Sequence, residues 1–246
     1  MKRNFLANFH THSEYCDGRG SLRDYVNSAL NKNLARLGFS GHAPLPFETG
    51  WAMKPEKLGG YLEEVNILAR EYAGSIEILR GLEVDYIPDI KFPDGAWIES
   101  LCLDYFIGSV HFLGFLSDGS RFTADGDKLE LKRGIEEAFG GSVRAAVESY
   151  YSLVAAMALE LKPSFIGHFD IIMKNNFDGS FFSEDEKWYR DCVIGSLEAV
   201  SQSERPLEVN TGGRIRNPRC PIYPSFWILK KAAEMKIPII LNADAH

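Results

Sequence analysis

Residues 54–84 read KPEKLGGYLEEVNILAREYAGSIEILRGLEV, a helical pattern over 54–73 followed by a short apolar run over 76–84. The same order of patterns recurs along the whole chain. Further strand-like runs lie at roughly 5–12, 36–42, 105–112, 164–168, 206–210 and 237–242, and helical patterns lie near 21–34, 94–103, 143–161, 183–204 and 224–236. This alternation predicts an α/β fold, a parallel sheet wrapped by helices, either as an open doubly wound sheet or as a barrel.

Capping and turn residues mark the ends of these expected elements. Ser21 and Ser183 are each expected to be the N-cap of a helix with an acidic first turn. Residues 114–141 are rich in Gly and Asp and are expected to form a long irregular loop over one face. The chain has 246 residues and no internal repeat or linker, so we expect a single domain over 1–246. Prolines that end a helix just before a strand stand at Pro163, Pro206 and Pro238.

Composition excludes several classes of protein. The formal net charge is −7 with no run of Lys or Arg, which argues against a nucleic-acid partner. The four cysteines are far apart and lack C-x-x-C spacing, so they indicate reduced thiols. No segment approaches the ~20 apolar residues of a membrane span, and no signal peptide is evident. We therefore expect a soluble cytoplasmic protein, as a monomer or a homo-oligomer.

The histidines share one placement. All of them lie at or near the C-terminal end of an expected strand: His10, His12, His42, His111, His168 and His246. Three carboxylates, Asp17, Glu83 and Asp244, share it too. In parallel α/β folds this edge of the sheet holds ligands and catalytic groups. The pairs His10/His12 and Asp244/His246 have i, i+2 spacing, which on an extended strand directs both side chains to one face.

Each of these residues alone has an ordinary structural explanation. A single strand histidine is more often a hydrogen-bonded core residue than a metal ligand, and Asp17-Gly18 alone indicates a turn. Nine such groups at one edge are better explained by metal binding. Imidazole and carboxylate without thiolate suit Zn, Mn, Fe or Ni. With one bridging carboxylate, nine ligands suffice for three divalent ions of three or four protein ligands each.

At these positions the sequence resembles the polymerase-and-histidinol-phosphatase (PHP) superfamily. His10-Thr11-His12 and Asp244-Ala245-His246 are typical of the superfamily as a whole. The segments 83–88 (EVDYIP) and 108–112 (GSVHF) resemble its histidinol-phosphate phosphatases more narrowly. The resemblance implies a distorted, TIM-like (β/α)7 barrel with metals at the strand C-termini. It also implies a metal-dependent phosphatase that converts L-histidinol phosphate to L-histidinol and phosphate in histidine biosynthesis.

The resemblance also implies a role for each ligand. Three metal ions, of Zn, Fe or Mn, would be held by His10, His12, Glu83 and Asp244, by Glu83, His111 and His168, and by Asp17, His42 and His246. Glu83 would bridge the first two ions. Asp244, His246 or a water would protonate the leaving group. Candidate phosphate-binding residues are Arg214 or Arg216, and more weakly Lys174 and Ser109.

The end of the chain departs from the expected barrel. A helix would follow the seventh strand, but the sequence stops at His246. Apolar side chains near this seam are then expected to be exposed, or covered by a neighbouring chain: Phe5, Leu6, Ile237 and Ile239.

Three alternative functions remain at this point. The first is a PHP phosphatase or phosphodiesterase for a nucleotide, a sugar phosphate or phosphotyrosine. The second is a non-catalytic metal-binding PHP module, although such modules lose ligands and all nine are present here. The third is an amidohydrolase, which would place a ligating lysine at the end of a middle strand. None is evident in the sequence.

Overall fold

The computed structural model describes residues 6–216 and 222–246. The chain forms two compact units. Unit 1 comprises Met1–Val84, Gly95–Ile107 and Leu241–His246, and unit 2 comprises Asp85–Asp94 and Gly108–Ile240. The main sheet has seven strands in the order β1-β2-β3-β4-β7-β8-β9, and the pairs β1–β2, β2–β3 and β7–β8 are parallel. This order follows the sequence, as expected when successive βα units add neighbouring strands.

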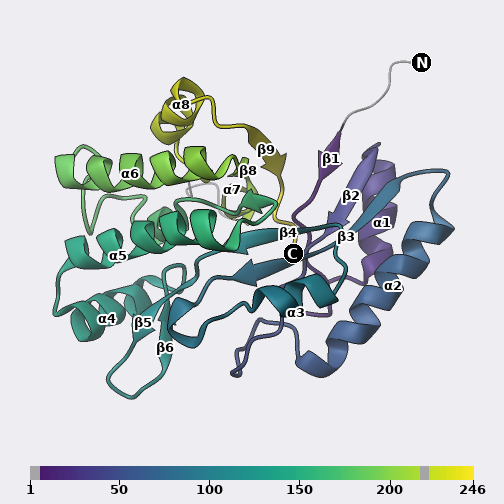
Figure 1. Ribbon diagram of the computed structural model, residues 1–246, viewed down its shortest axis with the longest axis horizontal. Coiled ribbons are helices and arrows are strands. Elements are labelled where there is room, and N and C mark those ends of the chain that lie inside the picture. Colours follow the sequence, from purple (N-terminus) through teal and green to yellow (C-terminus); the bar gives the residue numbers. More distant parts are fainter. Residues whose placement is uncertain (1–5, 217–221) are drawn as a thin grey trace. The chain divides into compact units, whose positions relative to one another are not determined.

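Unit 1 contains the first βα repeats, coloured purple to blue in Figure 1. Ser21 begins α1 with a capping box, because its hydroxyl accepts the backbone N–H of Asp24 while the Asp24 carboxylate accepts that of Ser21. The core residues include Leu22, Phe39 and Tyr61, all fully buried. The elements are β1 (Ala7–Asn8), α1 (Leu22–Asn31), β2 (Arg36–Phe39), η1 (Pro55–Lys57), α2 (Leu58–Glu71), β3 (Glu77–Asp85), α3 (Gly95–Ser100) and the start of β4 (Tyr105–Ser109).

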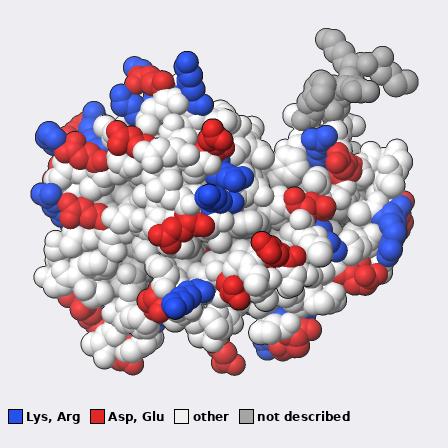
Figure 2. All heavy atoms as spheres, viewed as in Figure 1, with Lys and Arg blue, Asp and Glu red and all other residues white. Residues whose placement is uncertain are grey.

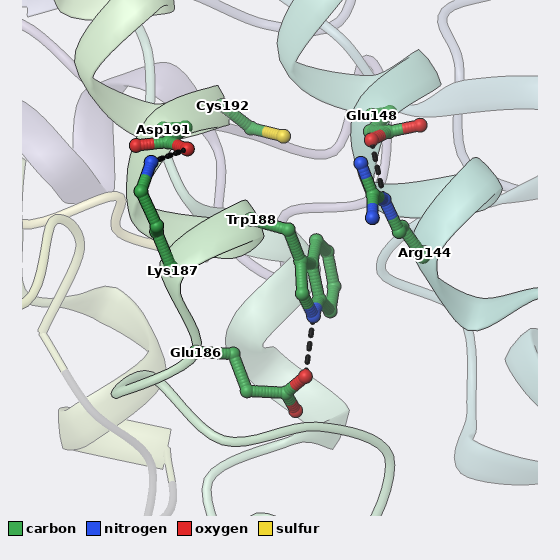
Figure 3. Close-up of a pocket in the computed structure, with 7 residues that line it drawn as sticks. All are labelled: Arg144, Glu148, Glu186, Lys187, Trp188, Asp191 and Cys192. Atoms are coloured by element: carbon green, nitrogen blue, oxygen red, sulfur yellow. Dashed lines mark hydrogen bonds and ion pairs between the residues drawn. The ribbon is translucent and has the colours of Figure 1, made fainter.

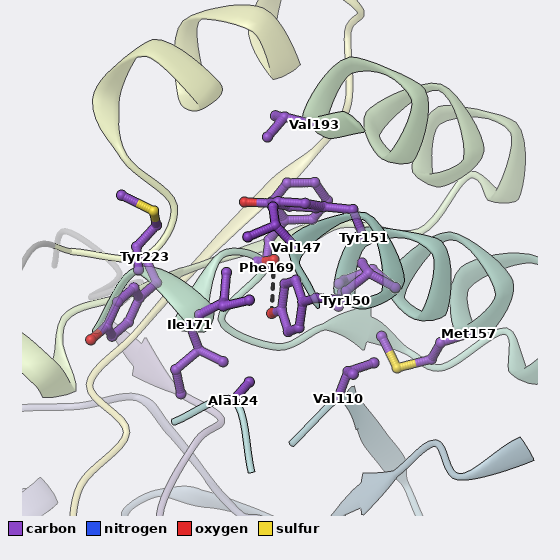
Figure 4. Packing of buried hydrophobic residues seen from close by; sticks show 14 of the residues in the cluster. Val110, Ala124, Val147, Tyr150, Tyr151, Met157, Phe169, Ile171, Val193 and Tyr223 are labelled. Atoms are coloured by element: carbon purple, nitrogen blue, oxygen red, sulfur yellow. Dashed lines mark hydrogen bonds between the residues drawn. The ribbon is translucent and has the colours of Figure 1, made fainter. Parts of the chain in front are cut away.

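Unit 2 packs its helices over a large apolar core. The elements are η2 (Pro88–Ile90), β5 (Phe112–Phe115), β6 (Arg121–Thr123), α4 (Lys128–Phe139), α5 (Val143–Ala156), η3 (Met157–Leu161), β7 (Phe165–Ile166), η4 (Ile171–Asn175), α6 (Lys187–Ser203), β8 (Leu207–Asn210), α7 (Gly212–Arg216), α8 (Phe226–Glu234) and the start of β9 (Ile239–Asn242). Figure 4 shows Tyr150, Tyr151 and Phe169 at the centre of this core, with Val193 of α6 and Tyr223 among the surrounding residues. The Tyr150 hydroxyl donates to the carbonyl of Phe169 at 3.0 Å, which satisfies a buried polar group.

The expectation of a long irregular loop over 114–141 is wrong, because most of this segment forms strands and a helix. β5 and β6 pair antiparallel, and the turn between them places Gly119 at φ +83°. Asp127 caps α4 by accepting the N–H groups of Leu129 and Glu130, and Gly140 ends the helix with a left-handed φ of +58°. The Gly and Asp residues that suggested a loop are thus the turn and cap residues of short elements.

Two smaller expectations are also corrected. Ser183 is not an N-cap, because α6 begins at Lys187 and Ser183 instead forms a turn with Asp185 and Glu186. Ile237 is buried at 6% exposure, although Leu6 and Ile239 are exposed as expected. Ile237 belongs to the unit 2 core, which explains its burial. Phe5 lies outside the described residues.

The surface charges are mixed. On the face shown in Figure 2, Lys and Arg side chains alternate with Asp and Glu, and neither sign forms a continuous patch. Between α5 and α6 lies a hollow lined by Trp188 and by charged residues that pair with one another, Arg144 with Glu148 and Lys187 with Asp191 (Figure 3). None of its lining residues is a predicted metal ligand. Among the described helices, none is both long and apolar enough to cross a membrane.

Candidate metal centre

Unit 1 brings together seven of the nine predicted ligands, which we call the unit 1 cluster: His10, His12, Asp17, His42, Glu83, Asp244 and His246. The backbone sets this arrangement. The N–H of His12 donates to the carbonyl of Ala245 at 2.8 Å, so the segment after β1 pairs with the one after β9. His42 and Glu83 face each other in a parallel bridge. The residues after β1, β2 and β9 and at the end of β3 therefore share one edge of the sheet, as the sequence predicted.

The inner part of the cluster is buried and compact. Glu83 Oε2 lies 3.0 Å from His10 Nε2 and 3.3 Å from His12 Nε2. Asp244 Oδ1 lies 3.5 Å and 3.3 Å from the same two nitrogens. Two ligands of one tetrahedral ion, each about 2.0–2.2 Å from it, are roughly 3.3–3.6 Å apart. Three of the four distances lie in this range, and the His10–Glu83 distance of 3.0 Å is slightly shorter. The donor types and their spacing therefore fit a divalent metal ion held by His10, His12, Glu83 and Asp244.

The outer part of the cluster is more open. Asp17 lies 3.2 Å from His246 Nε2 and 3.9 Å from His42 Nε2, and the side chains of Asp17 and His246 are 28% and 20% exposed. His12 joins this group too, since its Nδ1 is 3.4 Å from Asp17 and its ring stacks on His246 at a centroid distance of 4.0 Å. The sequence predicted Asp17, His42 and His246 as one ligand set. The structure brings these three together and adds His12 to them.

The electrostatics of the unit 1 cluster favour cations. Burial alone would raise the pKa of Glu83, but the imidazoles of His42 and His10 bring that pKa well below its ordinary value. Burial would also raise the pKa of the Asp244 carboxyl, but His10 and His12 lower that pKa well below its ordinary value. For His12, hydrogen bonds to Asp17 and Asp244 outweigh burial and raise the pKa of the ring. Ionised carboxylates buried in this way need a cation, which a metal ion supplies while displacing protons from the imidazoles.

Unit 2 contains the remaining two predicted ligands, His111 and His168. Their ring centroids are 4.9 Å apart, and the two residues are 5% and 2% exposed. His111 Nδ1 lies 2.8 Å from the buried Asp85 Oδ1. A carboxylate in this place orients a metal-binding imidazole and leaves Nε2 for the ion. The sequence assigned Asp85 no role, although a carboxylate two residues after Glu83 in a buried strand was a signal for one. Glu83 completes the predicted ligand set of these histidines, and that set stays a prediction.

The candidate phosphate-binding residues differ in their surroundings. Arg214 is exposed on α7, and the side chain of Arg216 lies outside the described residues. The ammonium group of Lys174 donates to the backbone carbonyl of Asp125 and lies 3.5 Å from its carboxylate. Ser109 is buried at the end of β4. All four assignments stay predictions. To bind a substrate phosphate, the Lys174 ammonium group would have to give up its contacts with Asp125.

Comparisons with known proteins agree with this geometry. The PHP domain matches residues 8–212. A histidinol-phosphatase of Bacillus subtilis is 32% identical over 96% of this chain and 92% of its own length. The crystal structure of a putative histidinol phosphatase from Listeria monocytogenes superposes with a TM-score of 0.82 at 24% identity, over 98% of this chain and 95% of that one. A histidinol phosphate phosphatase of Lactococcus lactis, solved with zinc, L-histidinol and phosphate, gives a TM-score of 0.73 at 21% identity, over 98% and 86% of the two chains. The fold expected from the sequence, a TIM-like α/β barrel of the PHP type, is therefore confirmed.

Proposed function

The chain belongs to the PHP family, in its histidinol-phosphatase branch, and we propose that it hydrolyses L-histidinol phosphate to L-histidinol and phosphate. The observation that carries this proposal is the unit 1 cluster, in which four imidazoles and three carboxylates meet at one edge of the sheet. The near full-length similarity to a histidinol-phosphatase narrows the class of phosphate ester to histidinol phosphate. The enzyme is thus a phosphoric monoester hydrolase.

The chemistry of the donor set suits this reaction. Divalent ions bound by such ligands neutralise the charge of a phosphate monoester and promote attack by water at neutral pH. Glu83 and Asp244 would keep the inner ion in place, because both are buried and ionised. We propose three ions, and zinc is one candidate because the Lactococcus relative binds it. The second ion would use Glu83 with His111 and His168.

The open side of the cluster is the side from which substrate would enter. Asp17 and His246 are its most exposed members, whereas His10 and His12 are fully buried. A phosphate held near the outer group would place its leaving oxygen close to His246 or Asp244. We propose these two side chains as the candidates for leaving-group protonation. Arg214 or Arg216 would bind the phosphate oxygens from α7.

Steady-state kinetics on one metal-analysed sample tests the proposal. L-histidinol phosphate should give the highest kcat/KM in a panel that also holds a nucleoside monophosphate, a sugar phosphate and phosphotyrosine. The same sample should contain about three ions per chain, as nine ligands with one bridge allow. A higher kcat/KM for another monoester would transfer the assignment to that substrate. Full metal content with no hydrolysis of any ester would support a non-catalytic metal-binding module.

A further inference from the structure

Glu208 is a fully buried carboxylate in β8, and it joins two parts of unit 2 that carry predicted site residues. Its Oε2 accepts the backbone N–H of His168 at 2.8 Å. The same oxygen accepts the side-chain amide of Asn210 at 3.0 Å. Burying an ionised carboxylate is costly unless such bonds compensate it. An apolar residue would fill this strand position at lower cost, so the carboxylate indicates a specific role.

The bond to His168 lies just beyond the end of a strand pair. Ile166 of β7 pairs with Leu207 of β8, and its N–H donates to the carbonyl of Pro206 at 2.9 Å. Two residues later, the N–H of His168 meets the Glu208 side chain instead of a backbone carbonyl. Hydrogen bonds to a carboxylate are shorter and stronger than those to a neutral acceptor. Glu208 therefore fixes the backbone of His168 where the regular pairing has ended.

Asn210 continues these contacts toward α7. Its side-chain carbonyl accepts the N–H of Gly212 at 2.9 Å, and Gly212 is the first residue of α7. The backbone of Asn210 also forms a two-bond bridge with Tyr223, at 2.6 and 3.0 Å. Gly213 fits closely over the Tyr223 ring, since a Cβ at this position would lie 2.8 Å from a ring carbon. The first turn of α7 is thus fixed by the hydrogen bond from Gly212 to Asn210 and by the packing of Gly213 on Tyr223.

From these contacts we propose that Glu208 and Asn210 are positioning residues that link the predicted metal ligand His168 to α7, the helix of the predicted phosphate-binding Arg214. A single buried oxygen of Glu208 holds the histidine backbone and the Asn210 amide, and Asn210 holds the first turn of α7. The predicted metal ligand His168 and the helix that carries Arg214 are thereby held in one fixed relative position. The inference rests on the proposed function, because it assigns His168 to a metal ion and Arg214 to the substrate phosphate.

The test compares Glu208→Ala, Glu208→Gln and Asn210→Ala in the full chain. Glu208→Ala should weaken binding of one metal ion by about 10–100-fold, as loss of a group that orients a ligand does. It should also speed amide exchange at His168 and raise KM. Asn210→Ala should raise KM for L-histidinol phosphate about 10-fold and speed exchange at Gly212, with metal content unchanged. Glu208→Gln keeps an oxygen acceptor, so its metal affinity and its KM should both be close to those of the wild type.

Glu184→Gln is the matched control. The Glu184 carboxylate also lies in unit 2 and also accepts side-chain hydrogen bonds, from Trp227 and Ser225, but it contacts no predicted site residue in the described hydrogen bonds. It should change neither metal content nor KM. The inference is overturned if Glu208→Ala behaves like Glu184→Gln, or if Asn210→Ala lowers thermal stability without changing KM or Gly212 exchange.

Two further outcomes are separable. If Glu208→Ala does not fold, Asn210→Ala decides through the exchange rate of the Gly212 amide, because Glu208→Gln is expected to behave like the wild type. An unchanged Gly212 rate in Asn210→Ala would contradict the link. If the wild-type chain fails to hydrolyse L-histidinol phosphate, the proposed function falls. The metal titration and the amide exchange then still test whether Glu208 and Asn210 position His168 and α7.

Discussion

The imidazole Nδ1 of His111 lies 2.8 Å from Oδ1 of Asp85, and both side chains are buried. This contact fixes which ring nitrogen faces away from the carboxylate. A histidine oriented in this way presents Nε2 to an ion and is a stronger ligand than a free imidazole. Asp85 therefore supports His111 without being one of the nine predicted ligands.

Asp85→Asn tests this support. The amide oxygen still accepts a hydrogen bond from His111, but the negative charge is lost, so we expect metal affinity to fall by about 10–100-fold. Metal titration followed by elemental analysis measures the change. Asp104→Asn is the control, because Asp104 accepts the backbone N–H of Arg80 at 2.7 Å and is not a predicted ligand. Equal metal affinity in the two variants would argue against the orienting role.

Glu83→Gln should cause the largest loss of activity. The Glu83 carboxylate is buried within 3.3 Å of three imidazoles, and its proposed bridging position affects two ions at once. We expect kcat to drop by several orders of magnitude, since metal ions held by Glu83 would supply the nucleophile and the charge stabilisation. Glu64→Gln should leave kcat unchanged, because among the described residues the Glu64 carboxylate accepts a hydrogen bond from Tyr15 and contacts none of the nine predicted ligands. A loss in Glu83→Gln no larger than in Glu64→Gln would refute the bridging role.

Much of the site was readable from the sequence because strand ends in a parallel sheet converge. The placement of His10, His42 and Asp244 needed only the alternation of strands and helices. Two features did not follow from it. The dual contact of His12 with the inner and the outer groups depends on ring orientation, which spacing does not encode. The β5–β6 hairpin and α4 were missed because Gly119 and Asp127 serve as well in turns and caps as in loops.

Removing the metals should destabilise the chain. Without metal ions, the buried carboxylates of Glu83 and Asp244 would have only protonated imidazoles to balance their charge. An ion present at 100 times its Kd stabilises the folded state by about 2.7 kcal/mol, so chelation should lower Tm by several degrees. Scanning calorimetry before and after chelation measures this, and adding back zinc should restore Tm. An unchanged Tm after verified metal loss would show that metal binding to the unit 1 cluster does not stabilise the folded chain.

Arg214→Ala tests phosphate binding from α7. Losing a charged hydrogen bond to substrate costs about 1.5–3 kcal/mol, which should raise KM by roughly 10–150-fold with a smaller change in kcat. Arg133→Ala is the control, because Arg133 of α4 pairs with Glu137 of the same helix and with Asp118 of the turn between β5 and β6. If KM is the same in both variants, Arg214 does not hold the phosphate, and Arg216→Ala becomes the deciding variant.

Gly81→Ala should damage the base of the unit 1 cluster. A Cβ at Gly81 would lie 2.5 Å from Cζ of the Tyr105 ring, and the Tyr105 hydroxyl lies 2.8 Å from the carbonyl of Phe9, next to His10. Displacing this ring overpacks the core at a cost of about 1–3 kcal/mol, or roughly 2–12 °C in Tm for a chain of this size.

Gly74→Ala is the matched control for this effect. A Cβ at Gly74 meets nothing within 4 Å, so Tm should change little. Because the Tyr105 hydroxyl lies beside the segment that carries His10 and His12, Gly81→Ala should also weaken the inner metal site, which Gly74→Ala should not. A Gly81→Ala chain with lowered Tm but wild-type metal affinity would show that the Tyr105 contact stabilises unit 1 without positioning these ligands. Equal Tm in the two variants would show that the ring moves aside at no cost.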